Sequence, residues 1–71
     1  MRNAEIVAVQ NYLTKLFENE RILLKKGRAE NQVEVYVKNE FVGTVYREED
    51  EGEISYSFNM AILDIDLPRA D

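Results

Sequence analysis

Apolar and polar positions near the start of the chain follow a helical period. One apolar stripe between residues 3 and 19 consists of Ile6, Val9, Leu13, Leu16 and Phe17. Steps of three and four residues are typical of an amphipathic helix that buries one side. Asn3 is suited to the N-cap, and Glu5 lies in the first turn, where the helix dipole favours an acid. We therefore predict one helix that ends near Glu18-Asn19.

The rest of the chain alternates between apolar and polar side chains, as strands do. The pattern predicts four strands, at residues 21–26, 32–38, 40–48 and 53–62. Lys38-Asn39 predicts a two-residue hairpin turn, and Asp50-Glu51-Gly52 predicts a three-residue turn in which glycine supplies a left-handed conformation. The register of the first strand stays open, because either Leu23 or the pair Ile22 and Leu24 could face the core.

The two turns together assign one face of the sheet to the core. They place Val35 opposite Val42, Val33 opposite Thr44, and Thr44 opposite Phe58. The predicted core face carries Val33, Val35, Val37, Val42, Thr44, Tyr46, Ile54, Tyr56, Phe58, Met60 and Ile62. Because the helix needs an apolar surface to cover, we predict an α+β fold for a single domain of residues 1–71. In it, one N-terminal amphipathic helix packs on a four-stranded antiparallel β-meander.

The opposite face of the predicted sheet is polar except for one small patch. In the predicted register Tyr36 lies opposite Phe41, and Val45 follows on the same face. No second helix is predicted to cover these side chains. Two interpretations remain open, an incidentally exposed patch and a contact surface.

The segment Leu63-Asp64-Ile65-Asp66-Leu67 continues the alternating pattern of the fourth strand. It has no partner in the predicted hairpin, because the third strand is already fully paired at Ile62. Its apolar positions change parity after Met60 and Ile62, which predicts a bulge or burial of the second face. An apolar strand at a sheet edge tends to pair with another chain. We expect the last strand and this tail to pair with a second copy, the alternative being a tail that folds back on its own core.

Composition narrows the functional classes. The chain has 71 residues with no Cys and no His, and its 9 basic and 14 acidic residues give a net charge of −5. The usual ligands of zinc, iron–sulfur and haem are therefore missing, as are a histidine base and a cysteine nucleophile. We predict no catalytic residue, no metal, no cofactor and no enzymatic activity.

Charge and hydropathy also bear on partners and location. The net negative charge argues against binding to nucleic acid or to anionic membranes. The apolar runs are shorter than the roughly 20 residues of a membrane span, and the first five residues lack the apolar core of a signal peptide. We therefore expect a cytoplasmic protein.

Two acidic segments suggest alternative functions. Glu48–Glu53 and the pair Asp64 and Asp66 could form a carboxylate site for a divalent cation, as a metal binder or small hydrolase. A further alternative is an acidic decoy that occupies a nucleic-acid-binding protein. The first segment is also the expected composition of a solvated hairpin tip that discourages aggregation.

Several short segments carry a resemblance to a known family. They are Tyr12-Leu13 with Leu16-Phe17, Glu34-Val35-Tyr36-Val37, Glu40-Phe41-Val42-Gly43, and residues 54–67. The chain resembles a family of short alphaproteobacterial proteins that are described only as a domain of unknown function. The resemblance implies a compact bacterial protein of one domain and transfers no site residue.

We therefore expect a small interaction or assembly module that forms a homodimer through its last strand or its uncovered sheet face. The candidate interface residues are Tyr36, Phe41, Val45, Leu63, Ile65 and Leu67.

Overall fold

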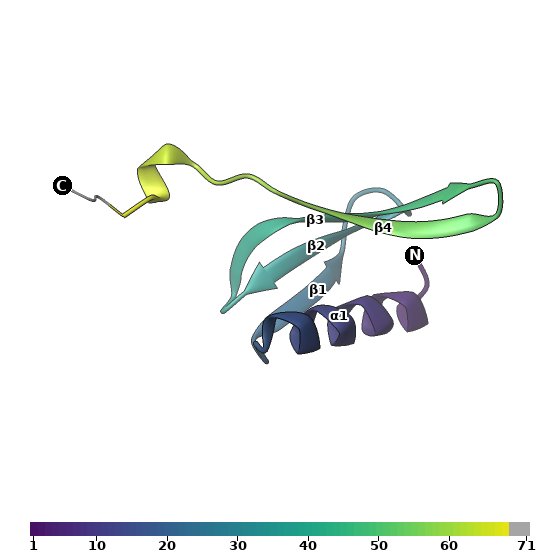
Figure 1. Ribbon diagram of the computed structural model, residues 1–71, viewed down its shortest axis with the longest axis horizontal. Helices are drawn as coiled ribbons and strands as arrows, with labels where there is room; N and C mark the ends of the chain where they lie inside the picture. The colour runs from purple at the N-terminus through teal and green to yellow at the C-terminus, as the bar shows by residue number, and fades with distance from the viewer. Residues whose placement is uncertain (69–71) are drawn as a thin grey trace.

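One helix and four strands account for most of the chain (Figure 1). The computed structural model describes residues 1–68. The elements are α1 (Asn3–Phe17), β1 (Ile22–Lys26), β2 (Gln32–Val37), β3 (Glu40–Asp50) and β4 (Glu53–Met60), and a 3₁₀ turn, η1 (Asp64–Asp66), follows. The strands form one antiparallel sheet in the order β1-β2-β3-β4, which confirms the predicted α+β meander. No helix within residues 1–68 is long and apolar enough to cross a membrane.

The ends of α1 are fixed mainly by backbone groups. The N-cap is Arg2 rather than the predicted Asn3, and the Arg2 N–H donates to the carboxylate of Glu5 at 3.1 Å. At the other end Glu18 adopts a left-handed conformation with φ of 51°. Its N–H donates to the carbonyl of Lys15, and this arrangement is a common way to end a helix. The predicted end of the helix is confirmed.

The structure settles the register of β1. Ile22 and Leu24 are buried, whereas Leu23 is exposed on the opposite face. The Leu24 N–H lies on the outer edge of the sheet and donates to the side-chain oxygen of Gln10 at 2.9 Å. A side chain of α1 therefore satisfies part of the β1 edge, which would otherwise be open to pairing.

A bulge in β3 overturns part of the predicted core face. The Lys38-Asn39 turn is confirmed, with positive φ at both residues and Val37 opposite Glu40. The register then shifts, so that Gly43 instead of Val42 lies opposite Val35. One extra residue reverses the alternation of a strand. Thr44 and Tyr46 therefore face away from the core.

Val45 is the residue that the bulge carries into the core. It is 1% exposed and pairs with Val33 on β2. The prediction that it lies on the outer face beside Tyr36 and Phe41 is wrong, because an unbroken alternation cannot anticipate the inserted residue.

The second turn also differs from the prediction. Asp50 pairs with Glu53, so the turn contains only Glu51 and Gly52, with φ of 51° and 85°. Positive φ at both central residues is the geometry that suits the twist of a two-residue hairpin. Val45 therefore lies opposite Phe58.

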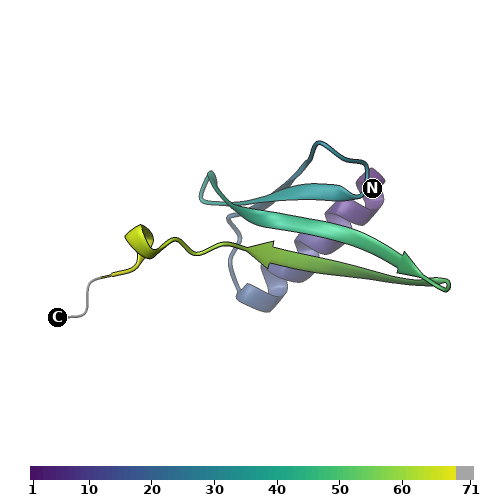
Figure 2. The same cartoon turned by 90° about the horizontal axis from the view of Figure 1, so that it is seen from above.

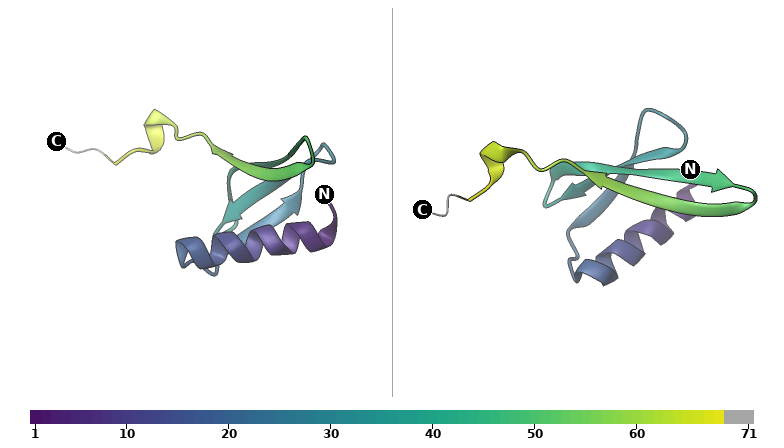
Figure 3. Two further views of the ribbon diagram at one scale, coloured as in Figure 1. Left: turned by 45° about the vertical axis from the view of Figure 1, so that its right-hand side comes forward. Right: turned by 45° about the horizontal axis from the view of Figure 1, so that its top comes forward.

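The core lies between α1 and the β1–β2 side of the sheet. Its buried members are Ile6, Leu13, Ile22, Leu24, Val33, Val35 and Val45. In the left view of Figure 3, α1 lies beside β1 at the bottom, while β4 passes at the top. No side chain of β4 is fully buried, so one half of the sheet has little cover.

The chain beyond β4 leads away from the sheet (Figures 1 and 2). The strand ends at Met60, and Ile62, which was predicted on the core face, is exposed. The Leu63–Leu67 segment, predicted as a strand continuation, contains the 3₁₀ turn instead, in which the Asp66 N–H donates to the Leu63 carbonyl at 2.9 Å.

Candidate functional site

An apolar groove of about 690 Å³ separates α1 from the β3–β4 hairpin. The helix contributes Ala8, Val9 and Tyr12 to its lining, and the sheet contributes Tyr56 and Phe58. Ala4 also lines the groove and lies four residues before Ala8, so both small side chains share one helix face. They are too short to reach β4, and this leaves the space open.

Across the groove from α1, β4 presents an apolar face that is largely uncovered. This inner face carries Ile54, Tyr56, Phe58 and Met60. Ile54, Tyr56 and Met60 are exposed although they share a face with Phe58, which packs partly against the core. The strand is also the last in the sheet and has no neighbour on its outer edge within residues 1–68. This region therefore combines free strand hydrogen-bonding groups with apolar side chains.

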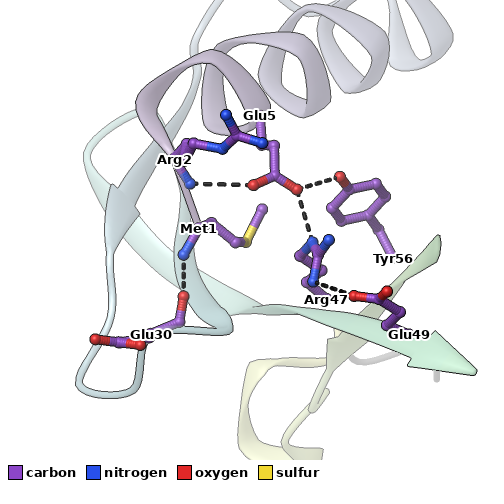
Figure 4. Close-up of polar contacts among 7 residues, drawn as sticks. All are labelled: Met1, Arg2, Glu5, Glu30, Arg47, Glu49 and Tyr56. Atoms are coloured by element: carbon purple, nitrogen blue, oxygen red, sulfur yellow. Dashed lines mark hydrogen bonds and ion pairs between the residues drawn. The ribbon is translucent and has the colours of Figure 1, made fainter. Parts of the chain in front are cut away.

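A polar cluster connects α1 to the hairpin (Figure 4). One carboxylate oxygen of Glu5 accepts hydrogen bonds from the Tyr56 hydroxyl at 2.7 Å and from the Arg47 Nε at 2.8 Å. The Arg47 Nη1 also lies 3.3 Å from a carboxylate oxygen of Glu49. The cluster holds the first turn of α1 against β3 and β4.

Hydrogen bonding keeps Glu5 ionised. The Tyr56 hydroxyl lowers the pKa of Glu5 most, followed by the Arg2 N–H, and together with Arg47 they bring it to about 2. The same contacts raise the pKa of Arg47 and of Tyr56. A carboxylate with so low a pKa is a poor general acid or base near neutral pH. The cluster is therefore suited to holding elements together.

The predicted outer patch is partly present. The rings of Tyr36 and Phe41 meet edge to face at 5.7 Å, and the Lys25 ammonium lies 4.7 Å above the Tyr36 ring. Leu23 lies opposite Tyr36 on β1 and adds an exposed apolar side chain that was not predicted as part of this patch. Val45 is absent from this surface, because it belongs to the core.

The predicted tail residues are all accessible. Leu63, Ile65 and Leu67 are 55%, 80% and 49% exposed. None of them joins the core, so in this structure the tail does not fold back over its own sheet. Besides the outer patch of Leu23, Tyr36 and Phe41, the described part of the chain thus leaves apolar side chains uncovered in the groove, on the inner face of β4 and along the tail.

The acidic segments do not gather into a site. Among residues 1–68, no three side chains of the metal-ligating types His, Cys, Asp and Glu come together. Glu48 accepts a hydrogen bond from Ser57 at 3.1 Å, and Glu49 is engaged by Arg47. The carboxylates of Glu48–Glu53 therefore lack the converging arrangement that a divalent cation needs.

The groove itself was not predicted, although Val9 and Leu13 on the apolar stripe and Tyr56 and Phe58 on the core face belong to its lining. Ala4, Ala8 and Tyr12 recur at steps of four on α1, and this spacing is visible in the sequence. The spacing alone, however, does not show how far α1 lies from β4, because that distance depends on tertiary packing.

Comparisons with known proteins identify the family. No curated protein and no solved structure matches the chain. The family described as Protein of unknown function (DUF3126) matches residues 5–66, which include all but the first two residues of α1, all four strands and η1. The chain belongs to this family.

Proposed function

We propose that the protein is a small assembly module that forms a homodimer through the β4 side of its sheet. The observation that supports this most directly is the amount of uncovered surface. The chain has 6021 Å² of accessible surface. A folded chain of 8.3 kDa is expected to expose about 4,600 Å². The excess of about 1,400 Å² is larger than the roughly 800 Å² that each partner buries in a standard interface.

The distribution of this surface favours one side of the molecule. Among residues 1–68, seven of the 13 exposed large apolar side chains lie on β4 or in the segment that follows it, and the others are divided between α1 and the outer face of the sheet. The opposite edge of the sheet, at β1, is partly satisfied by Gln10. The β4 edge lacks such a contact within the described part of the chain. Association there would remove apolar surface from water and pair free backbone groups.

The alternative functions have less support. A metal binder or hydrolase would need converging carboxylates, and the acids of Glu48–Glu53 are spread along a hairpin tip. A decoy of nucleic acid would need acids along one face, whereas these acids concentrate at one end. The proposal therefore includes no enzymatic activity and no nucleic-acid partner. A cytoplasmic location is consistent with a chain that needs no disulfide.

Sedimentation velocity tests the proposal. We expect the mass to change from 8.3 kDa to twice that value as the protein concentration rises. A protein that stays monomeric at every concentration up to about 1 mM would contradict the proposal. A dissociation constant above that value corresponds to an association free energy weaker than about 4 kcal/mol.

Two matched variants locate the interface. Ile54 on the inner face of β4 and Leu23 on the outer face of β1 are 48% and 41% exposed. Ile54→Lys should raise the dissociation constant at least about tenfold, since it places a charge in the contact. Leu23→Lys should leave it unchanged. The opposite result would assign the dimer to the outer patch of Leu23, Tyr36 and Phe41.

A further inference from the structure

The tail is an apolar segment with no cover of its own. Leu63, Ile65 and Leu67 project from a short 3₁₀ turn, and the chain leads away from α1 and the sheet (Figures 1 and 2). Such a segment costs free energy in water unless another surface receives it.

The groove and the tail agree in length. The groove follows α1 from Ala4 to Tyr12, which is about 12 Å at 1.5 Å per residue. The Leu63–Leu67 segment spans about 8 Å as a 3₁₀ turn and about 13 Å when extended. In the extended form, where alternate side chains share one face, the tail can therefore place all three of its apolar side chains along the groove.

Charge also favours this pairing. Asp64 and Asp66 are the only charged side chains between residues 61 and 68. Arg2 lines the groove and forms no ion pair with the residues that the structure describes. Glu5, the acid beside it, is already matched by Arg47. An acidic tail would thus meet an unmatched cation at the helix start.

A second copy is a better source of the tail than the same chain. The last paired residue of β4 is Met60, opposite Gly43, and the chain after β4 leads away from α1 (Figure 1). Entry into its own groove would require a tight reversal within Ala61-Ile62-Leu63. These residues include neither Gly nor Pro, and aliphatic side chains are poorly suited to turns.

We infer that the groove between α1 and the β3–β4 hairpin binds the Leu63–Leu67 segment of a second copy. The exchange is reciprocal, so each dimer contains two such contacts. This inference rests on the proposed homodimer and adds its principal contact.

Two surface variants test the inference in the full chain. Ala8→Glu adds bulk and negative charge inside the groove, and Val7→Glu is its control on the same helix, outside the groove lining. Ile65→Glu alters the tail. We expect Ala8→Glu and Ile65→Glu each to weaken the dimer at least tenfold, whereas Val7→Glu leaves the dissociation constant unchanged. All three positions are exposed, and circular dichroism with thermal unfolding at low concentration checks that each variant folds.

Mixing the Ala8→Glu and Ile65→Glu variants gives a more specific test of exchange between copies. A heterodimer of Ala8→Glu with Ile65→Glu retains one intact groove and one intact tail that face each other. It should form with higher affinity than either variant alone, as measured by fluorescence transfer between labelled chains. Absence of this rescue would overturn exchange between copies.

The outcomes separate this inference from the proposed function. If Ala8→Glu and Ile65→Glu dimerise as the unmodified chain does, the homodimer stands and the tail contact is wrong. If only Ile65→Glu dissociates, the tail binds elsewhere, and the groove assignment is wrong. If the unmodified chain is monomeric throughout, both proposals fail.

Discussion

At the scale of single residues, Glu5 connects the first turn of α1 to both strands of the hairpin. Its pKa is about 2 in the folded protein, against an ordinary value of 4.5. The unfolded chain therefore binds a proton between these two pH values that the folded chain does not bind. The contribution of Glu5 to stability is complete above pH 4.5 and is lost as the pH falls toward 2.

Glu5→Gln should flatten this part of the pH profile. Glutamine keeps the size of the side chain and cannot titrate, so its free energy of unfolding should change less between pH 4.5 and 2. Urea unfolding at a series of pH values measures the effect. Parallel profiles for the two proteins would show that Glu5 is not held ionised by its neighbours.

Gly43 lies where β3 and β4 approach too closely for a side chain. A Cβ atom there would clash with the carbonyl oxygen of Asn59 and would lie 2.8 Å from a ring carbon of Phe58. Gly43→Ala must therefore displace β4, and we expect it to cost about 1–3 kcal/mol of unfolding free energy.

Gly52→Asn provides the control for Gly43→Ala. Gly52 has φ of 85° and open space around it, and asparagine tolerates the left-handed region. We expect this variant to lose less than about 1 kcal/mol. Equal losses in urea unfolding would mean that the close approach of β3 and β4 is not the reason for Gly43.

At the scale of elements, local sequence patterns were sufficient to predict the helix, the strands and one of the two hairpin turns. The helix, the four strands and the first hairpin turn all follow from period and turn residues, and the structure confirms them. The apolar stripe of α1 is confirmed only in part, because Ile6 and Leu13 are buried and Val9 packs against the core, whereas Leu16 and Phe17 at its end are exposed. The face of β4 that carries Tyr56 and Phe58 was also predicted. The predicted register was wrong by one residue at the bulge and again by one residue at the second turn. The two errors cancelled, so the side chains of β4 were assigned to the correct face.

The candidate site could be predicted only in part, because only some of its features are encoded in local sequence patterns. The tail residues were visible as an apolar pattern without a partner. The groove requires the position of Val45 and the distance between α1 and β4, and both depend on tertiary packing. The bulge itself has no strong local signal, because Phe41-Val42-Gly43 suits an unbroken strand except for its glycine.

The bulge can be tested by one pair of variants. Val45 is buried, and its neighbour Thr44 faces the opposite side. Val45→Ala should cost about 2 kcal/mol, since it removes buried carbon and leaves a small cavity. Thr44→Ala should cost less than about 1 kcal/mol. The reverse order of urea midpoints would restore the unbroken register.

At the scale of the whole molecule, the shape departs from that of an isolated compact domain. The radius of gyration is 13.7 Å and the longest extent is 49 Å. A compact chain of 71 residues is expected to have a radius of gyration of about 11 Å. The excess reflects the projecting hairpin and tail, so the extended parts of the chain are separate from the packed core.

This separation leads to a prediction about truncation after Ile62. The buried residues end at Val45 in sequence, with Phe58 partly packed against them, and the tail contributes none. A chain without residues 63–71 should therefore keep its melting temperature at low concentration. The intact chain should melt at higher temperature as its concentration rises, because dimerisation stabilises only the folded form. The truncated chain should lose most of this dependence. If truncation lowers the melting temperature equally at all concentrations, the tail belongs to its own core and does not serve as a contact between copies.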